Sequence, residues 1–182
     1  CPFFFDITKV KSHMDIYVAN EKYDGYLRDG CVFRNDVNIF DKMAATIHYK
    51  NGVQVAYSLT TYSPYEGYRI AFNGTKGRLE AWIQESRKTS DVNYDEIVLF
   101  KNFSKREYIH IPFGTSGHGG GDALLKDQLF LPNDDDPYCQ CANSRDGALA
   151  CLVGIAARNS IATKQPVKIA DLTSISPMKK KQ

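Results

Sequence analysis

The segment from Tyr65 to Glu80 places the strongest constraint on how this 182-residue chain can fold. Its centre, Asn73-Gly74-Thr75-Lys76-Gly77, contains the residue types that tolerate positive φ in tight hairpin turns. Ile70 and Phe72 alternate on one side before the turn, and a second alternating set follows it. That second set comprises Leu79, Ala81 and Ile83. The segment therefore predicts two strands joined as a β-hairpin.

Similar patterns stand on both sides of this hairpin. Alternating apolar residues begin near Met43, reach the Asn51-Gly52 dipeptide that favours type I′ turns, and continue to Leu59. Two more strands are predicted over residues 96–101 and 107–111, separated by a polar turn. Six strands in succession with short turns imply a largely antiparallel meander.

Helical periodicity follows the strands. Asp122 is predicted to cap a helix that runs through Phe130, with Leu125 and Leu129 four residues apart. Ser144 is predicted to cap a longer and more strongly patterned helix. The apolar stripe of that helix comprises Ala148, Cys151, Leu152, Ile155 and Ala156. A run of strands followed by helices predicts an α+β fold: a large, mostly antiparallel open sheet with helices packed on one face.

The pattern divides the chain into three parts. Residues 1–40 are expected to form an irregular arm or excursion, with a short helix from about residue 12 to 22. Residues 41–172 are expected to form the sheet-plus-helix domain, which ends with a short edge strand over 167–169. Residues 173–182 are expected to form a solvated tail.

Composition excludes several functional classes. With 43% hydrophobic residues, 24% charged residues and a net charge of +2, the chain is typical of a soluble globular protein and not of a nucleic-acid binder. The longest apolar run, Ala148 to Ala157, is about half of the roughly 20 residues that a membrane span requires. A cytoplasmic location is favoured, and an export signal upstream of Cys1 stays open because the Cys-Pro-Phe-Phe-Phe start suggests a segment cut from a longer protein.

The five cysteines predict no metal site. Cys139 and Cys141 are separated by a single residue, whereas zinc pairs usually have two to four residues between them. Cys151 lies on the apolar stripe of the predicted helix and is expected to be a small core residue.

A glycine-rich loop, Gly117-His118-Gly119-Gly120-Gly121-Asp122, is one candidate for ligand contact. Glycines let a backbone approach a ligand closely, and His118 can donate or accept a hydrogen bond at neutral pH. Asp122 would orient His118 or hold a sugar hydroxyl; the alternative is a plain connection in which Asp122 only caps the helix. No Gly-x-Gly-x-x-Gly motif joins a strand to a helix, so no dinucleotide site is predicted.

The second candidate is the start of the central hairpin. Tyr65, Glu66, Tyr68 and Arg69 combine aromatic rings with hydrogen-bonding ends, which suits a sugar-like ligand. The alternative is that they decorate a sheet face. A face rich in aromatic residues is also expected to meet another copy or another domain. These aromatic residues are Tyr57, Tyr62, Tyr65, Tyr68 and Trp82.

Three segments in combination resemble a known family. They are Tyr65 to Glu80, Gly117 to Asp122, and the stretch from Ser144-Arg145-Asp146-Gly147-Ala148 through Gly154-Ile155-Ala156-Ala157-Arg158 to Pro166-Val167-Lys168-Ile169. Together they resemble the glucose–fructose oxidoreductase, inositol dehydrogenase and rhizopine-catabolism family, Gfo/Idh/MocA. Its members pair an N-terminal Rossmann domain that binds NAD(P) with a C-terminal α/β domain, which supplies substrate contacts and often the oligomer interface.

The resemblance implies that this chain is such a C-terminal domain. It implies an NAD or NADP cofactor for the parent protein and none for this chain, with a Rossmann domain upstream. It also implies a sugar or polyol substrate and a homo-oligomer formed through the sheet face. The Glu-Lys-Pro motif that carries the family's catalytic lysine is absent from this sequence. Ser12-His13-Met14-Asp15 does not match the family's histidine motif, because it has one residue between His and Asp where the family has two. No catalytic residue is therefore assigned, and the isolated chain is expected to be inactive; the alternative is a non-catalytic carbohydrate-binding or assembly module.

Overall fold

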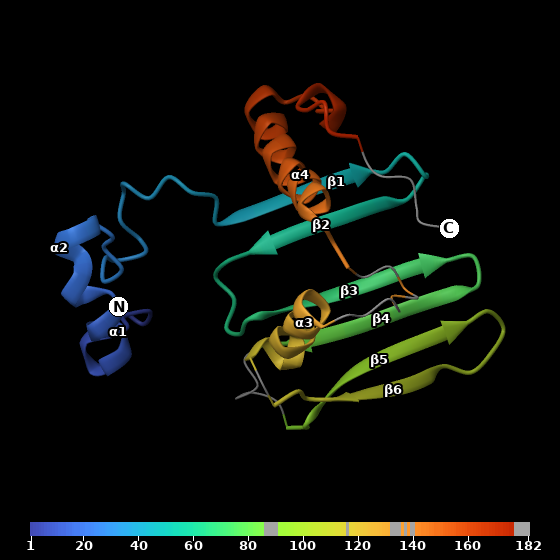
Figure 1. Ribbon diagram of the computed structural model, residues 1–182, viewed down its shortest axis with the longest axis horizontal. Coiled ribbons are helices and arrows are strands. Elements are labelled where there is room, and N and C mark those ends of the chain that lie inside the picture. Colours follow the sequence, from blue (N-terminus) through green and yellow to red (C-terminus); the bar gives the residue numbers. More distant parts are fainter. Residues whose placement is uncertain (86–90, 116, 132–135, 137, 139–140, 177–182) are drawn as a thin grey trace. The chain divides into compact units, whose positions relative to one another are not determined.

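The computed structural model describes residues 1–85, 91–115, 117–131, 136, 138 and 141–176. The chain divides into two compact units, Cys1–Thr61 and Tyr62–Gln182. Figure 1 labels the main helices and strands of each unit. This division falls inside the predicted 41–172 domain, because the first two strands belong to the first unit.

The first unit begins with four short helical turns. They are the 3-10 helix η1 (Ile7–Lys9), α1 (Lys11–Ile16), the 3-10 helix η2 (Val18–Asn20) and α2 (Glu21–Asp24). The single helix predicted over residues 12–22 is therefore interrupted. Asn20 explains the break, because its side-chain amide donates to the carbonyl oxygens of Asp15 at 2.8 Å and Ile16 at 3.0 Å. Those carbonyls, at the end of α1, would otherwise lack a partner.

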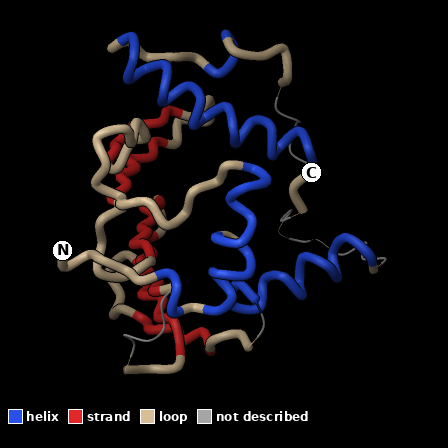
Figure 2. Tube along the Cα trace, turned by 90° about the vertical axis from the view of Figure 1, so that its left-hand side faces the viewer, coloured by secondary structure: helices blue, strands red, loops and turns tan. Residues whose placement is uncertain are grey.

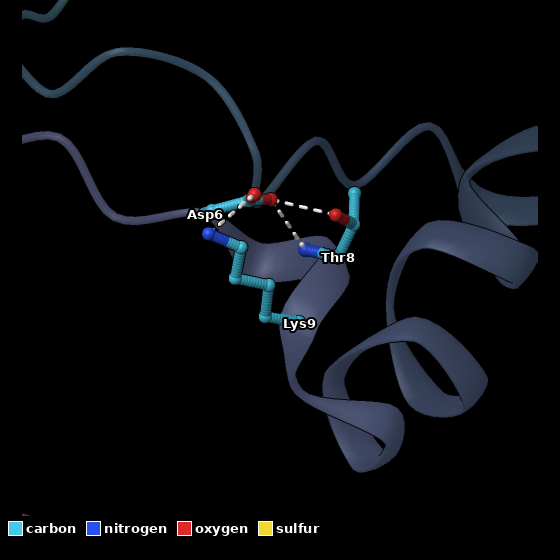
Figure 3. Close-up of polar contacts among 3 residues, drawn as sticks. All are labelled: Asp6, Thr8 and Lys9. Carbon is cyan, nitrogen blue, oxygen red and sulfur yellow. Dashed lines mark hydrogen bonds and ion pairs between the residues drawn. The ribbon is translucent and has the colours of Figure 1, made fainter.

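A side-chain cap fixes the first turn of this unit (Figure 3). Asp6 Oδ1 accepts hydrogen bonds from the backbone N–H of Thr8 at 3.1 Å and from its hydroxyl at 2.6 Å. The Lys9 ammonium lies 3.7 Å from the other carboxylate oxygen of Asp6. Ile7, within this turn, is buried.

The first unit ends with a β-hairpin. β1 (Lys42–His48) pairs antiparallel with β2 (Gln54–Thr60). The turn uses the predicted Asn51-Gly52 dipeptide: Gly52 has φ +86°, and Asn51 Oδ1 accepts from the backbone N–H of Val53 at 3.1 Å. The predicted strand pair is confirmed.

The second unit contains a four-stranded sheet. β3 (Gly67–Gly74), β4 (Gly77–Gln84), β5 (Tyr94–Lys101) and β6 (Glu107–Pro112) lie in sequence order, and each pairs antiparallel with the next. The predicted central hairpin and the α+β class with antiparallel strands are confirmed, and Figure 2 shows the mixture of strands and helices. The described strands form two hydrogen-bonded sheets, one of two strands and one of four.

The register separates two faces of the four-stranded sheet, because cross-strand partners share a face and successive residues alternate between faces. The apolar face carries Ile70, Phe72, Leu79, Ala81, Ile97, Leu99 and Ile109. The mixed face carries Arg69, Arg78, Glu80, Trp82, Glu96, Tyr108 and His110. Aromatic and charged side chains therefore gather on the mixed face. The aromatic residues predicted to share one face do not all lie on it. Tyr68 pairs with Ile83 on the apolar face, while Trp82 lies on the mixed face.

Two turns are joined at one end of this sheet. The side-chain amide of Asn102, after β5, donates to the carbonyl oxygen of Thr75, between β3 and β4, at 2.9 Å. The backbone N–H of Asn102 also donates to the carbonyl oxygen of Lys76 at 3.3 Å. These bonds connect two hairpin turns that are 27 residues apart in sequence.

A glycine-rich turn, η4 (Gly117–Gly120), leads into α3 (Gly121–Phe130). The N-cap of α3 is Gly120, so the prediction that Asp122 caps this helix is wrong. Asp122 lies inside the first turn, and its carboxylate bonds to His118 instead. Leu125 and Leu129 are 55% and 67% exposed, so the predicted apolar pair of α3 faces solvent in the described structure.

The longest helix is α4 (Ser144–Thr163). Its N-cap is Asn143, one residue before the predicted Ser144, because Asn143 and Asp146 form a reciprocal capping box. Ala156 is buried and Leu152 half-buried, as the predicted stripe requires. Cys151 and Ile155 are exposed, so Cys151 is not a core residue.

The end of the chain also departs from the pattern. The edge strand predicted over 167–169 is absent from the described residues, and a 3-10 turn, η5 (Ile169–Asp171), stands in its place. Its backbone bonds close locally, from Asp171 N–H to Lys168 C=O at 3.0 Å and from Leu172 N–H to Ile169 C=O at 3.0 Å. The last six residues of the predicted tail, 177–182, lie outside the described residues. No helix in the described ranges is long and apolar enough to cross a membrane.

Candidate functional site

The six predicted site residues all lie in the second unit, where they fall into separate groups. The first group forms around an aromatic residue that the prediction had placed only on an interface. The Arg69 guanidinium carbon lies 4.5 Å from the centroid of the Trp82 ring, and the Tyr65 ring lies 6.0 Å from Trp82 at 58°. Such a cation–π contact contributes about 0.5–1 kcal/mol at an exposed position. Strand pairing across the predicted hairpin places Trp82 directly opposite Arg69. The strand register is therefore the signal that could have added Trp82 to the predicted site residues.

The remaining two residues of the predicted hairpin site do not join this group. Tyr68 faces the opposite side of the sheet, as the alternation of a strand requires. Glu66 contributes its backbone, since its carbonyl oxygen accepts from the N–H of Glu85 at 2.9 Å. Tyr65 and Arg69 therefore both lie beside Trp82, whereas Tyr68 lies on the other face of the sheet.

The second group is a histidine–aspartate pair. His118 Nδ1 lies 2.8 Å from Asp122 Oδ1, and the two side chains are 87% and 48% exposed. An ionised carboxylate can only accept, so the histidine donates through Nδ1. In neutral imidazole this leaves Nε2 as an acceptor, available to a hydroxyl group in solution. The two side chains lie within hydrogen-bond distance, which is the geometry that the prediction of an orienting Asp122 requires.

An unusual backbone presents this pair. His118 has φ +50° and ψ +45°, a left-handed conformation that costs energy for any residue with a Cβ. Two glycines of this turn have no room for a Cβ, so a larger residue at either position would force neighbouring atoms to move. A Cβ at Gly114 would lie 2.0 Å from the Gly119 carbonyl oxygen, and one at Gly117 would lie 2.5 Å from Asp122 Oδ2. Strained backbone of this kind is often retained where a side chain must be aimed.

An open hollow of about 620 Å³ lies along the mixed face. Arg69, Trp82, Tyr94 and Glu96 are among the residues that line it. Beside it, His110 Nε2 lies 3.3 Å from Glu96 Oε2, and the Tyr94 and His110 rings stack at 3.9 Å and 21°. The hollow combines flat rings with both signs of charge, a lining suited to a polar ligand or to a protein partner.

Within the described part of the chain, no three His, Cys, Asp or Glu side chains lie together in an arrangement that could hold a metal ion. Cys139, the first residue of the Cys139-x-Cys141 pair, lies outside the described residues.

Comparison with known proteins gives two matches. Residues 6–169 match the family described as "Oxidoreductase family, C-terminal alpha/beta domain" of the Gfo/Idh/MocA type. The chain is also 33% identical over 163 residues to the protein named "Putative oxidoreductase YteT" from Bacillus subtilis (strain 168). That match covers 88% of this chain and 38% of YteT, so the chain spans well under half the length of this relative. No solved structure gives a significant match. The family match extends over most of the residues whose antiparallel strands and helices are described above, and the chain belongs to the Gfo/Idh/MocA oxidoreductase family as a C-terminal alpha/beta domain.

Proposed function

We propose that this chain is the substrate-contacting and self-associating domain of an NAD(P)-dependent oxidoreductase that acts on a sugar or polyol. The supporting observation is the His118–Asp122 pair, which a glycine-rich loop holds at 2.8 Å and leaves exposed to solvent. Family membership supplies the reaction class.

The nucleotide belongs to another domain in this proposal. A dinucleotide crevice is built at the carboxyl ends of parallel strands, and every described strand pair here is antiparallel. The described residues therefore do not fit NAD(P), and no step through that cofactor is assigned to them. When bound by a Rossmann domain, NAD(P) would supply hydride transfer to or from a sugar carbon.

This chain would contribute hydrogen bonds to the substrate hydroxyls. His118 Nε2 accepts from one hydroxyl, and Asp122 keeps the ring in the tautomer that leaves Nε2 free to do so. A bond of this type contributes about 0.5–1.5 kcal/mol, so binding to the isolated chain should be weak and concentrated at the loop.

The test is a titration of the isolated chain followed by backbone NMR shifts. Glucose, myo-inositol and sorbitol serve as probes, and NAD and NADP are titrated separately. We expect at least one polyol to shift the resonances of residues 117–122, and His118→Gln to weaken that response. His48→Gln, on β1 of the first unit, is the matched control and should leave it unchanged. Tight NAD(P) binding, or no loop response to any polyol, would contradict the proposal.

A non-catalytic carbohydrate-binding module is the second candidate. The hollow on the mixed face favours it, since Trp82 and Tyr94 offer rings of the kind that stack on sugar C–H faces. The same titration separates the two: polyol-induced shifts centred on Trp82 with none at His118 would support the module.

A further inference from the structure

One arginine on the mixed face has hydrogen-bonding groups that no described residue occupies. The Arg69 guanidinium carbon lies over the Trp82 ring, 4.5 Å from its centroid. Among the residues that the structure describes, no hydrogen bond or ion pair joins this guanidinium to another group. Arg78 lines the same hollow but is already bonded, since it donates to Glu80 Oε1 at 2.5 Å and to Asn73 Oδ1 at 2.6 Å. Arg69 can therefore receive an acceptor without giving up a polar partner.

The neighbours of Arg69 along β3 leave room beside it. Gly67 and Ala71 lie two residues before and after it, so they share its face of the sheet. Gly67 has no side chain, and a Cβ at this position would lie 2.3 Å from the carbonyl oxygen of Ile83. Ala71 adds only a methyl group and lines the hollow. These small residues keep the hollow open on both sides of the guanidinium.

We propose that this hollow binds a small carboxylate that also carries hydroxyl groups, such as a sugar acid, with its carboxylate on Arg69. The planar guanidinium donates two parallel hydrogen bonds to a carboxylate, and an ammonium group cannot reproduce that geometry. Trp82 supports the guanidinium from one side, so its side chain loses less freedom when a ligand binds. The volume of about 620 Å³ is within the range of small-molecule sites and larger than a bare carboxylate needs.

Two further side chains of the lining can meet the hydroxyl groups. Gln84 lies opposite Gly67, is half-buried, and its amide has no hydrogen-bond partner among the described residues. Glu96 places Oε2 3.3 Å from His110 Nε2, which leaves Oε1 as an acceptor. An amide and a carboxylate oxygen are suitable partners for hydroxyl groups.

The negative charge of Glu96 does not prevent this binding. Its strand is two spacings from that of Arg69, roughly 10 Å, which is about the Debye length at 0.1 M salt. A carboxylate on Arg69 would lie about 2.7–2.9 Å from the guanidinium nitrogens. Attraction at contact therefore outweighs screened repulsion across the hollow, and the remaining acid on this side, Glu80, is bonded to Arg78.

The test is a titration of the 182-residue chain with gluconate, followed by NMR of the Trp82 indole N–H and the Arg69 side-chain N–H. Sorbitol is the matched control ligand, because it replaces the carboxylate of gluconate with a hydroxymethyl group. Acetate, which has no hydroxyl group, should bind more weakly than gluconate and at the same resonances. Sorbitol should leave both resonances unchanged.

Variants separate the guanidinium from the charge alone. Arg69→Gln should weaken gluconate binding by about tenfold or more, and Arg69→Lys should weaken it several-fold although the charge is kept. Arg106→Gln is the matched control, because it removes the same charge from a residue outside the lining and should leave the affinity unchanged. Circular dichroism of each variant checks that the fold is retained.

The results can refute this site without refuting the proposed function. Equal responses to gluconate and sorbitol at Trp82, or an unchanged affinity in Arg69→Gln, would overturn the carboxylate site. An Arg69→Lys variant that binds as well as the wild type would overturn the bidentate contact. Because the same spectra report residues 117–122, a gluconate response at Trp82 without a polyol response at His118 refutes only the polyol contact, and the reverse refutes only the carboxylate site.

Discussion

Replacing Asn143 with alanine tests the account of the longest helix. Asn143 Oδ1 accepts from the backbone N–H groups of Arg145 at 2.9 Å and Asp146 at 3.1 Å, and Asp146 Oδ2 accepts from the N–H of Asn143 at 3.0 Å. Asn143→Ala removes the first two bonds and leaves the third. Loss of such a cap lowers the free energy of unfolding by about 0.5–2 kcal/mol. Because the bond from the backbone N–H of residue 143 to Asp146 remains, we expect a loss of about 1 kcal/mol. In a protein of this size that corresponds to a fall in Tm of about 2–4 °C.

The assay is urea unfolding followed by far-UV circular dichroism, with Ser144→Ala as the control. Ser144 is an equally good cap by residue type, but the structure places it inside the helix, so its replacement should change stability by less than about 0.5 kcal/mol. The double variant Asn143→Ala/Asp146→Ala should lose less than the sum of the two single losses, because the two side chains share one box. If Ser144→Ala proves as destabilising as Asn143→Ala, the assignment of the cap is wrong.

Three further outcomes follow from local geometry. Lys164 ends α4 with φ +58°, so Lys164→Gly should stabilise by about 1 kcal/mol in urea unfolding, whereas Lys168→Gly, at an extended position, should destabilise; equal effects would contradict this. Gly114→Ala should disturb NMR resonances throughout the glycine loop, because the new Cβ would lie 2.0 Å from a carbonyl oxygen, while Gly121→Ala meets nothing within 4 Å and should leave the loop unchanged. Burial, followed by neighbouring negative charge, raises the pKa of Glu21, so its contribution to stability is complete at low pH and is lost as pH rises through the folded pKa. The free energy of unfolding, measured as the pH rises through the pKa of Glu21, should decline in the wild type and not in Glu21→Gln. Identical pH profiles for the two proteins would refute the raised pKa of Glu21.

The strands could be predicted because period-two alternation and turn residues are local signals. The Asn51-Gly52 dipeptide and the Asn73 to Gly77 turn each mark a hairpin, and once a turn is placed the register across it follows. That register also determines which side chains share a face. The pairing of Arg69 with Trp82 therefore follows from the sequence, and the same register places Tyr68 and Trp82 on opposite faces.

The helix ends could not be predicted to the residue. Asn143 and Ser144 are both good capping residues, and only the backbone conformation decides which of them lies outside the helix. Asp122 had two partners within reach, the helix N-terminus and His118, and the left-handed turn at His118 decided between them. Residues 167–169 were predicted as a strand because Val167 and Ile169 are β-branched. The backbone at Ile169 instead forms hydrogen bonds within a local turn, which the residue types alone do not indicate.

The bond between Asn102 and Thr75 has a practical consequence for anyone who modifies this protein. An affinity tag or fluorescent peptide inserted into either turn would pull apart two loops that hold each other, and the strain would reach all four strands. The Asn51-Gly52 turn is a better place for such an insertion, since its closing bonds join Tyr49 to Val53 and Gly52 within the same hairpin. A reporter there would leave the hydrogen bond between the Thr75 and Asn102 turns intact.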